Sequence, residues 1–106
     1  MNKYLQIAAD VARKSKCRYK HGCVVVHNGR VISRATNKKI GDPRLEWRRS
    51  HVHAEAAAAI AARSRISGAH VYVARIGPDG KPQESKPCVK CERYLLRMGV
   101  ARITWT

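Results

Sequence analysis

Apolar positions near the start of the chain recur at the spacing of an α-helix. In residues 3–16 the apolar side chains fall on one helical face, and most of the basic ones lie on or near the other. Two β-branched runs follow, at 23–27 and 30–36, with Asn28-Gly29 between them. Both residues of a tight hairpin turn must accept a positive φ, as Asn and Gly do readily. The pattern therefore predicts a helix over 3–16 and a two-stranded hairpin.

The second half of the chain predicts two helices, each followed by a strand. In chain order these are a helix over 54–65, a strand over 70–76, a helix over 88–98 and a strand over 100–105. The first of the two helices is nearly all alanine, so we expect it to be buried on most of its circumference. The segments 37–50 and 77–86 contain Gly, Pro and charged residues and predict loops.

The predicted order of helices and strands is typical of an α/β domain in which helices cover a mixed sheet. With 106 residues the chain can form one hydrophobic core, so residues 1–106 are expected to fold as a single domain. The sheet would have about four strands. Its last strand would lie at an edge, which must be covered, blunted or paired with another subunit.

Composition changes this picture through its charge. The chain has 22 Lys and Arg against 7 Asp and Glu, and the difference, 22 − 7, is a formal net charge of +15. Such an excess predicts a polyanionic or phosphorylated partner. The hydrophobic fraction of 44% predicts a folded protein rather than a disordered basic tail. The longest apolar run, 56–62, is too short to cross a membrane, and no secretory signal is visible. We therefore expect no membrane partner, no secretion, and a cytoplasmic or nucleoid-associated location.

Two short motifs, each at the start of a predicted helix, carry candidate chemistry. They are His53-Ala54-Glu55 and Pro87-Cys88-Val89-Lys90-Cys91. A catalytic zinc takes three protein ligands and keeps a fourth position for water, and His53, Cys88 and Cys91 supply that set. Glu55 is not needed as a ligand and can take the proton of the water and pass it on. H-x-E with P-C-x-x-C is typical of zinc nucleobase deaminases, in which hydroxide attacks the ring carbon that bears the exocyclic amine.

Two other interpretations of the cysteines stay open at this point. A Cys-x-x-Cys pair can be a redox centre, although such a pair usually opens the helix after an early strand and this one comes late. It can also be half of a structural zinc site, with a fourth ligand from Cys17, Cys23 or a histidine. A disulfide framework is not expected without a secretory signal. Cys23 opens an apolar run and is expected to be a small buried hydrophobe.

Beyond these motifs, the sequence resembles the cytidine deaminase-like superfamily over nearly its whole length. Residues 15–18 and 21–26 look like the start of deoxycytidylate deaminases. Residues 26–32 and Asn37 look equally like bacterial tRNA adenosine deaminases. Residues 99–103, the exit from the last helix into the last strand, resemble both groups.

The resemblance implies a three-layer α/β/α fold with helices on both faces of the sheet. It implies zinc on the three ligands named above, with Glu55 as the proton shuttle. It also implies that Asn37, at the exit of the second strand, hydrogen-bonds the sugar or base of the substrate, and that the backbone around Ala54 holds the base. Without the resemblance, Asn37 would be interpreted as a residue that caps a loop.

The chain also departs from the family. The loop over 77–86 is longer than in either group of relatives, and Lys86 stands before Pro87 where relatives often carry Ser or Glu. Relatives usually have a fifth strand and one or two more helices after the position of Thr106. We therefore expect a homo-oligomer in which a neighbouring subunit supplies walls of the pocket.

Substrate contacts are predicted on the loops around the zinc site. The candidates are Tyr19, Asn37, Trp47, Arg48, Ala54, Ser85 and Lys86. Tyr19 and Trp47 can stack on bases, as aromatic side chains do when they hold single strands. The alternative is that the loop charges are only solvated and that Trp47 packs on the domain.

Three functions compete. They are deamination of cytosine in a free nucleoside or nucleotide, deamination of a base in single-stranded DNA or RNA, and a non-enzymatic zinc-stabilised nucleic-acid-binding domain. Glu55 argues against the third function, because it has no structural reason to lie beside the metal. The charge of +15 exceeds what one mononucleotide needs and favours a polynucleotide. The resemblance of the first 26 residues favours cytosine, with adenosine in tRNA or other RNA as the alternative base.

Overall fold

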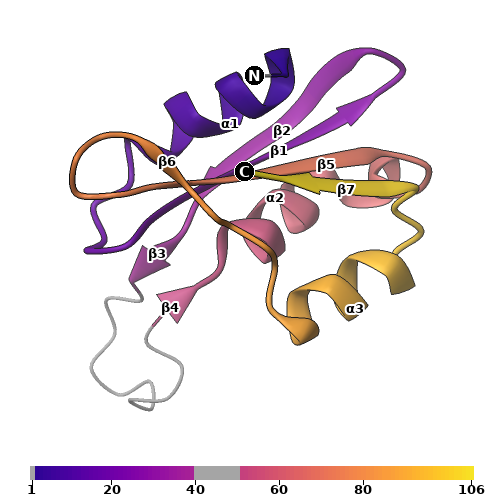
Figure 1. Ribbon diagram of the computed structural model, residues 1–106. Helices are drawn as coiled ribbons and strands as arrows, with labels where there is room; N and C mark the ends of the chain where they lie inside the picture. The colour runs from indigo at the N-terminus through magenta and orange to yellow at the C-terminus, as the bar shows by residue number, and fades with distance from the viewer. Residues whose placement is uncertain (1, 40–50) are drawn as a thin grey trace.

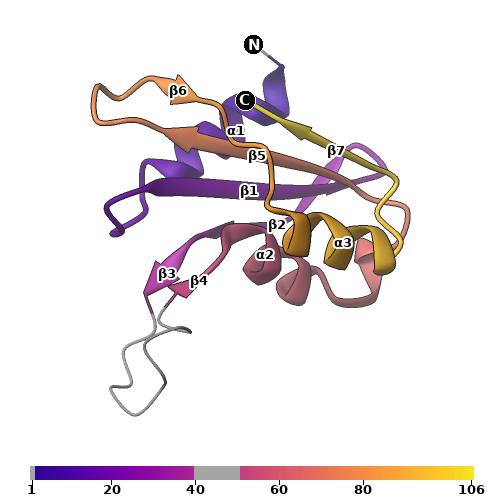
Figure 2. The same cartoon turned by 60° about the horizontal axis from the view of Figure 1, so that its bottom comes forward.

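A mixed sheet with helices on both faces forms the computed structural model, which describes residues 2–39 and 51–106 (Figure 1). The helices are α1 (Lys3–Ala12), α2 (Ala54–Ala62), the 3₁₀ helix η2 (Arg63–Ile66) and α3 (Val89–Arg97). Helix α1 covers one face of the sheet, and α2 and α3 cover the other (Figures 1 and 2). This is the three-layer arrangement expected from the sequence. No helix among the described residues is long and apolar enough to cross a membrane.

The main sheet has five strands, where the sequence predicted about four. They are β1 (Lys20–His27), β2 (Arg30–Thr36), β5 (His70–Ile76), β6 (Pro82–Gln83) and β7 (Arg102–Trp105). β1 pairs antiparallel with β2 on one side and with β5 on the other. The other edge of β5 pairs with β7 in parallel and with the short β6 antiparallel. A separate two-stranded sheet joins β3 (Lys38–Lys39) to β4 (His51–Val52).

The hairpin between β1 and β2 forms as predicted. Asn28 and Gly29 have φ angles of 51° and 74°, the left-handed conformation that this turn requires. The register shifts between Val25 and Val26, where β2 contributes one extra residue. A bulge of this kind increases the local twist of the hairpin.

Strand β1 divides the core into two layers, because successive side chains point to opposite faces of the sheet. Cys23 and Val25 are fully buried on the side of α2 and α3, whereas Val24 and Val26 pack on the side of α1. The expectation that Cys23 is a buried hydrophobe is confirmed.

A glycine lets α1 approach β1 closely. A Cβ atom added to Gly22 would collide with the carbonyl oxygen of Ala8 and with the backbone nitrogen of Ala12. These are backbone atoms of the helix, so they cannot turn aside as a flexible side chain would. The small residues on this face of α1 and the glycine on β1 therefore set the distance between helix and sheet.

Several element boundaries differ from the predictions. Helix α1 ends at Ala12 rather than at residue 16, because the amides of Lys14 and Ser15 bond to carbonyls three residues earlier and turn the chain away. The alanine-rich α2 is buried on one side only, and the side chain of Ile60 is 65% exposed. The short strands β3 and β6 lie where the sequence predicted only loops, and β4 lies in a short segment to which no element was assigned.

Candidate active site

The two motif-bearing helices begin next to one another on the same side of the sheet (Figure 1). His53 is the N-cap of α2, and Cys88 is the N-cap of α3. Neither side chain caps its own helix, so the imidazole and the thiol stay available for another partner. The first-turn amides of both helices lack intrahelical acceptors and favour negative charge nearby.

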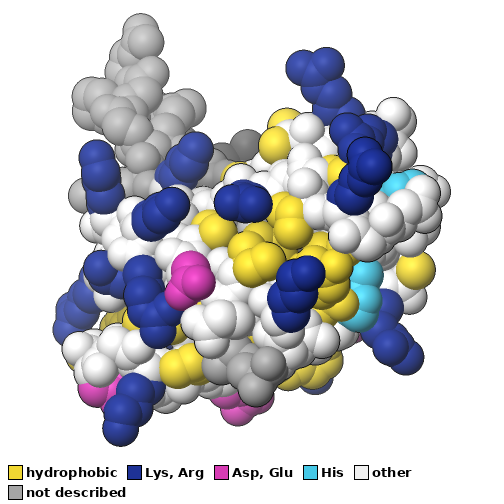
Figure 3. Space-filling model, turned by 90° about the horizontal axis from the view of Figure 1, so that it is seen from above, with side chains coloured by type: hydrophobic (Ala, Val, Ile, Leu, Met, Phe, Trp, Pro, Cys, Tyr) yellow, Lys and Arg dark blue, Asp and Glu magenta, His cyan; other side chains and the backbone are white. Residues whose placement is uncertain are grey.

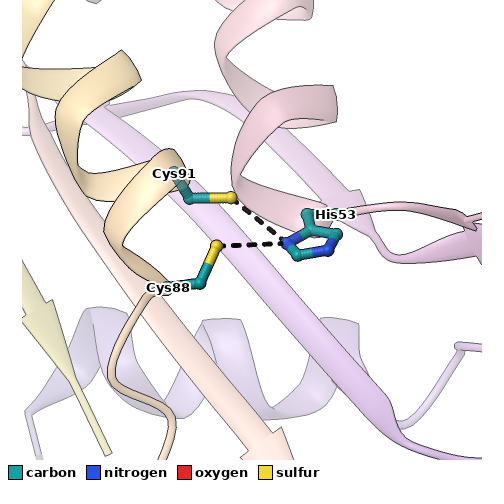
Figure 4. A group of neighbouring side chains, drawn as sticks. All are labelled: His53, Cys88 and Cys91. Carbon is teal, nitrogen blue, oxygen red and sulfur yellow. Dashed lines mark hydrogen bonds between the residues drawn. The ribbon is translucent and has the colours of Figure 1, made fainter. Parts of the chain in front are cut away.

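Three potential metal ligands converge between these helix ends (Figure 4). The Nδ1 atom of His53 lies 3.2 Å from the sulfur of Cys91 and 3.7 Å from the sulfur of Cys88. All three ligand atoms lie within 4.8 Å of one another, and in residues 2–39 and 51–106 no other Cys, His, Asp or Glu belongs to the group. One nitrogen and two sulfurs are the donors that zinc prefers, and three ligands leave its fourth tetrahedral position open.

Anionic or potentially anionic side chains gather around this group and favour a bound cation. Burial raises the pKa of the Cys91 thiol well above its ordinary value, and the neighbouring Glu55 carboxylate and Cys88 raise it further. Zinc binds thiolates, so the ion would reverse this balance by supplying positive charge where three anionic or potentially anionic groups meet. His53, Cys88 and Cys91 are therefore positioned to bind zinc.

The structure separates these ligands from the other two cysteines. The thiol of Cys17 donates to the backbone carbonyl of Asn37 at 3.5 Å, away from the group. Cys23 is fully buried in the core, where burial, with smaller effects of Glu55 and Cys91, raises the pKa of its thiol. A structural zinc site with a fourth cysteine ligand therefore finds no support in the described part of the chain.

A cavity of about 400 Å³ opens beside the ligands. It is lined by Tyr19, His21, Asn37, His53, Ala54, Glu55, Ser85, Lys86, Pro87 and Cys88. It thus unites most of the predicted site residues from four separate segments. Trp47 and Arg48, which were predicted to contact the substrate, lie outside the described residues.

Glu55 and Ala54 form the wall of the cavity that α2 provides. Both side chains are buried, with Glu55 5% exposed and Ala54 1% exposed. Glu55 is the only acidic residue in the first turn of α2, where the helix dipole favours a carboxylate. A buried carboxylate next to three metal ligands and a cavity is suited to moving a proton.

Asn37 lies in the cavity wall, and its side chain also holds the structure together. Its Oδ1 atom accepts hydrogen bonds from the Ser15 hydroxyl at 2.7 Å and from the His21 amide at 3.1 Å. Its Nδ2 atom donates to the Tyr19 carbonyl at 2.7 Å. The amide therefore ties the segment between α1 and β1 to the end of β2, as a loop-capping residue does.

Ser85 is held by the sheet rather than directed to the cavity. Its hydroxyl donates to the Val73 carbonyl at 2.9 Å, lies 2.8 Å from the Thr106 hydroxyl and accepts from the Thr106 amide at 3.0 Å. Its own amide donates to the Thr106 carbonyl. The hydroxyl and the amide of Ser85 are therefore both engaged within the sheet.

Two of the lining residues, Tyr19 and Lys86, take part in contacts between a cation and an aromatic ring. The Tyr19 ring is 58% exposed and has the guanidinium groups of Arg18 and Arg75 at 5.6 and 5.9 Å from its centroid. The ammonium group of Lys86 lies 5.9 Å from the centroid of a Trp105 ring. Such contacts keep cations and aromatic faces together at the surface of the protein.

His21 lines the cavity but was not among the predicted substrate contacts. Its pKa is lowered by burial, and Arg75 and His53 lower it further, whereas Glu55 acts in the opposite direction. The predicted strand began at residue 23, so His21 was assigned to a basic loop. The signal that could have found it is its alternation with Cys23 along a strand that starts at Lys20.

Comparison with known proteins agrees with this geometry. The family model for the cytidine and deoxycytidylate deaminase zinc-binding region matches residues 1–106. The chain belongs to this family. Its members bind zinc in the region that here contains His53, Cys88 and Cys91. Among curated proteins, no sequence matches this deaminase-family chain at a significant level.

Solved structures share the fold at low sequence identity. The chain is similar to dCMP deaminase from the cyanophage S-TIM5, with a TM-score of 0.74 and 20% identity over 99% of this chain and 84% of that one. It is similar to cytidine deaminase from Mycobacterium tuberculosis, with a TM-score of 0.64 and 21% identity over 100% of this chain and 85% of that one. RibD from Acinetobacter baumannii matches with a TM-score of 0.66 and 22% identity over 97% of this chain, which spans only 27% of RibD. At these identities the likeness shows the cytidine deaminase-like fold.

Proposed function

We propose that this chain is a zinc-dependent hydrolytic deaminase that converts cytosine to uracil in a nucleotide or in single-stranded nucleic acid. The observation that carries the proposal is the position of Glu55. Its carboxylate is buried in the wall of the cavity that also exposes His53 and Cys88. A structural zinc site has no use for a buried carboxylate that is not a ligand, whereas deamination needs a group that moves protons at this place.

Three lining residues have a direct role in this reaction. Zinc, when bound, supplies an activated water for attack on the ring carbon that bears the amine. Glu55 would take a proton from the attacking water and deliver it to the departing nitrogen, while the second proton of the water passes to the ring nitrogen. A C–O bond forms, the C–N bond breaks and ammonia leaves, which gives uracil. Ala54 brings the free first-turn amides of α2 to the polar edge of the base. Tyr19 offers an exposed ring on which the base or its neighbour can stack.

Support for cytosine comes from the relatives. The S-TIM5 enzyme is a dCMP deaminase that was also solved in complex with dCMP and dUMP, and the Mycobacterium tuberculosis enzyme is a cytidine deaminase. We extend the cytosine base, but not the free nucleotide, from these proteins to this chain. The choice of base needs a direct test, because the hairpin and Asn37 of this chain resemble tRNA adenosine deaminases as well.

The test offers four substrates to the purified zinc-loaded protein in parallel: dCMP, cytidine, a single-stranded oligonucleotide with one cytosine, and an RNA hairpin with one adenosine. Mass spectrometry detects deamination as replacement of an amine by oxygen. The variant Glu55→Gln should keep its zinc and lose a factor of about 10² to 10⁴ in kcat. Glu84→Gln is the matched control, because Glu84 is exposed and does not line the cavity.

The outcomes separate the competing functions. Conversion of cytosine by the wild type and by Glu84→Gln, but not by Glu55→Gln, supports the proposal. Conversion of the adenosine alone would assign the other base. If wild type and Glu55→Gln hold zinc equally and neither converts any substrate, the protein is a zinc-stabilised binding domain and the proposal is wrong.

We also propose that the chain forms a homo-oligomer. Support comes from large apolar side chains that α2 and α3 expose, namely Ile60, Val89 and Leu96. Within the described residues, β7 pairs only with β5, which leaves one edge of β7 able to pair with another chain. Light scattering during size-exclusion chromatography should give a multiple of the 11.9 kDa chain mass, and a mass of 11.9 kDa at all concentrations would contradict the oligomer.

A further inference from the structure

A second and larger cavity, of about 740 Å³, lies next to the candidate active site. It is lined by Lys14, Lys16, Cys17, Arg18, Thr36, Asn37 and Lys38. Four of the seven lining residues are cationic and none is acidic. Its volume is within the range of small-molecule and cofactor sites. The function proposed above does not use this cavity.

The fold builds this cavity. Helix α1 stops at Ala12, and the following segment turns back to the end of β2, where Asn37 holds Ser15 and Cys17. Lys14, Lys16 and Arg18 of this segment line the cavity together with Lys38 of β3. Strand β3 lies at one end of the sheet (Figure 1). Lysines that are far apart in sequence therefore face one shared space.

The positive charge of this cavity has no counterpart in the described residues. Over residues 2–39 and 51–106 the structure forms one ion pair, between Arg13 and Asp10 at 2.7 Å, and it does not involve the cavity. Lys and Arg side chains spread across the α1 side of the molecule, and few Asp and Glu side chains lie among them (Figure 3). Like charges that line one cavity repel each other and attract an anion, and several lysines on flexible stems suit a chain of phosphates.

The two cavities share a wall. Asn37 lines both, and the consecutive residues Arg18 and Tyr19 face different cavities, with Arg18 in the basic one and Tyr19 in the catalytic one. The Arg18 guanidinium lies 5.6 Å from the centroid of the Tyr19 ring. A polynucleotide that stacks a base on Tyr19 would therefore bring the adjacent phosphates to Arg18 and the lysines.

We infer that the basic cavity binds the phosphodiester backbone next to the target nucleotide, so that the substrate of this deaminase is a single-stranded polynucleotide. The inference rests on the proposed function, because it names the substrate of the same catalytic cavity. A mononucleotide with its base in the catalytic cavity could offer the basic cavity only its own phosphate group, whereas a strand brings several phosphates to the four cations there. Each phosphate contact to a single strand contributes a slope of about 0.7 to the dependence of log affinity on log salt.

The experiment compares two triple variants that remove the same charge. The cavity variant carries Lys14→Gln, Lys16→Gln and Lys38→Gln. The control variant carries Arg30→Gln, Arg65→Gln and Arg97→Gln, which lie on the β1–β2 hairpin, in η2 and at the end of α3. All six side chains are exposed, so both variants should fold, which far-UV circular dichroism and zinc content verify.

Binding is measured in a Glu55→Gln background, so that it does not depend on turnover. The probe is a fluorescent single-stranded oligonucleotide of about 12 nucleotides with one cytosine, titrated at several salt concentrations. The cavity variant should bind at least about tenfold more weakly at low salt, with a salt slope reduced by about 2. In the Glu55 background, its kcat/KM should fall on the oligonucleotide and stay unchanged on dCMP. The control variant should match the parent protein in all measurements.

Three results would overturn the inference. Equal losses in the cavity and control variants would mean that only the total charge matters. An equal loss of kcat/KM on dCMP and on the oligonucleotide would place the lysines in the mononucleotide site. Displacement of the oligonucleotide by inorganic triphosphate at equal concentration would identify a site for a compact free anion. If the proposed function is wrong but the inference holds, no substrate is converted, while oligonucleotide binding still depends on the basic cavity.

Discussion

Replacing Asn37 should destabilise the protein even without substrate. Its side chain makes three hydrogen bonds, to Ser15, His21 and Tyr19, at 2.7, 3.1 and 2.7 Å. A typical hydrogen bond contributes about 0.5–1.5 kcal/mol net, and three therefore give about 1.5–4.5 kcal/mol. In Asn37→Ala the amide of His21 also loses its acceptor in a partly buried position, so we expect a loss of about 2–4 kcal/mol.

A second substitution divides this loss. Asn37→Asp keeps the oxygen that accepts from Ser15 and His21, but it replaces the donor to the Tyr19 carbonyl by a second oxygen. We expect a loss of about 1–2 kcal/mol, roughly half that of the alanine variant. Thr36→Val is the control on the same strand end, because it keeps the β-branched shape, and its expected change is under about 0.5 kcal/mol.

The assay is urea unfolding of the zinc-loaded protein without nucleotide, followed by far-UV circular dichroism, together with the KM for the preferred substrate. If Asn37→Ala changes the unfolding free energy by less than about 0.5 kcal/mol and raises only KM, the three bonds contribute little and Asn37 is purely a substrate contact. If stability and KM both change, the residue holds the wall of the cavity and the ligand through the same amide.

Three more perturbations test other parts of the structure. Gly22→Ala should lower the unfolding free energy by about 3 kcal/mol or more, because the added Cβ would meet backbone atoms of α1. Urea unfolding measures this loss, and an unchanged midpoint would mean that α1 moves freely away from β1. Removing zinc with a chelator should abolish activity and lower the melting temperature, because the binding free energy of zinc stabilises the folded protein. Without a cation the buried Cys91 thiol stays protonated, and added zinc should restore both activity and melting temperature. Lowering the pH below about 6.5 should reduce the unfolding free energy, because the pKa values of His21 and His70 are lowered in the folded protein, mainly by burial, so the unfolded chain takes up more protons. Unfolding curves at pH 7.5 and 5.5 measure this effect, and His70→Gln should weaken it, whereas curves that coincide would show that these two histidines titrate alike in both states.

The parts of the fold that were predictable from sequence depend on local rules. Asn28-Gly29 has one favoured turn, and β-branched runs beside it pair into a hairpin whatever the rest of the chain does. The motif around Cys88 was predictable for the same reason, because a Cys-x-x-Cys pair at a helix start fixes two ligands by local geometry.

The remaining features depend on contacts between distant segments. Just after the end of α1, Ser15 bonds to Asn37, 22 residues later, and periodicity within the helix carries no sign of this contact. Ser85 precedes Lys86 and Pro87 in the sequence, but its hydroxyl is held by Val73 and Thr106. The exposed side of α2 was also missed, because a run of alanines does not distinguish a helix buried all round from one packed on a single side.

The positive charge of the chain has more than one function once it is placed on the fold. Arg75 lies over the Tyr19 ring and Lys86 lies over Trp105, so these two cations are partly engaged by aromatic faces. Arg18 lies over the same Tyr19 ring but lines the basic cavity. Lys14, Lys16 and Lys38 line the same basic cavity, where none of the lining residues that the structure describes is acidic. Cations of the first kind can orient one nucleotide, whereas the lysines of the second kind repel one another and have no reason to lie together unless an anion binds there. Net charge alone therefore does not decide between nucleotide and polynucleotide, whereas the division of charge across the wall at Asn37 favours the polynucleotide.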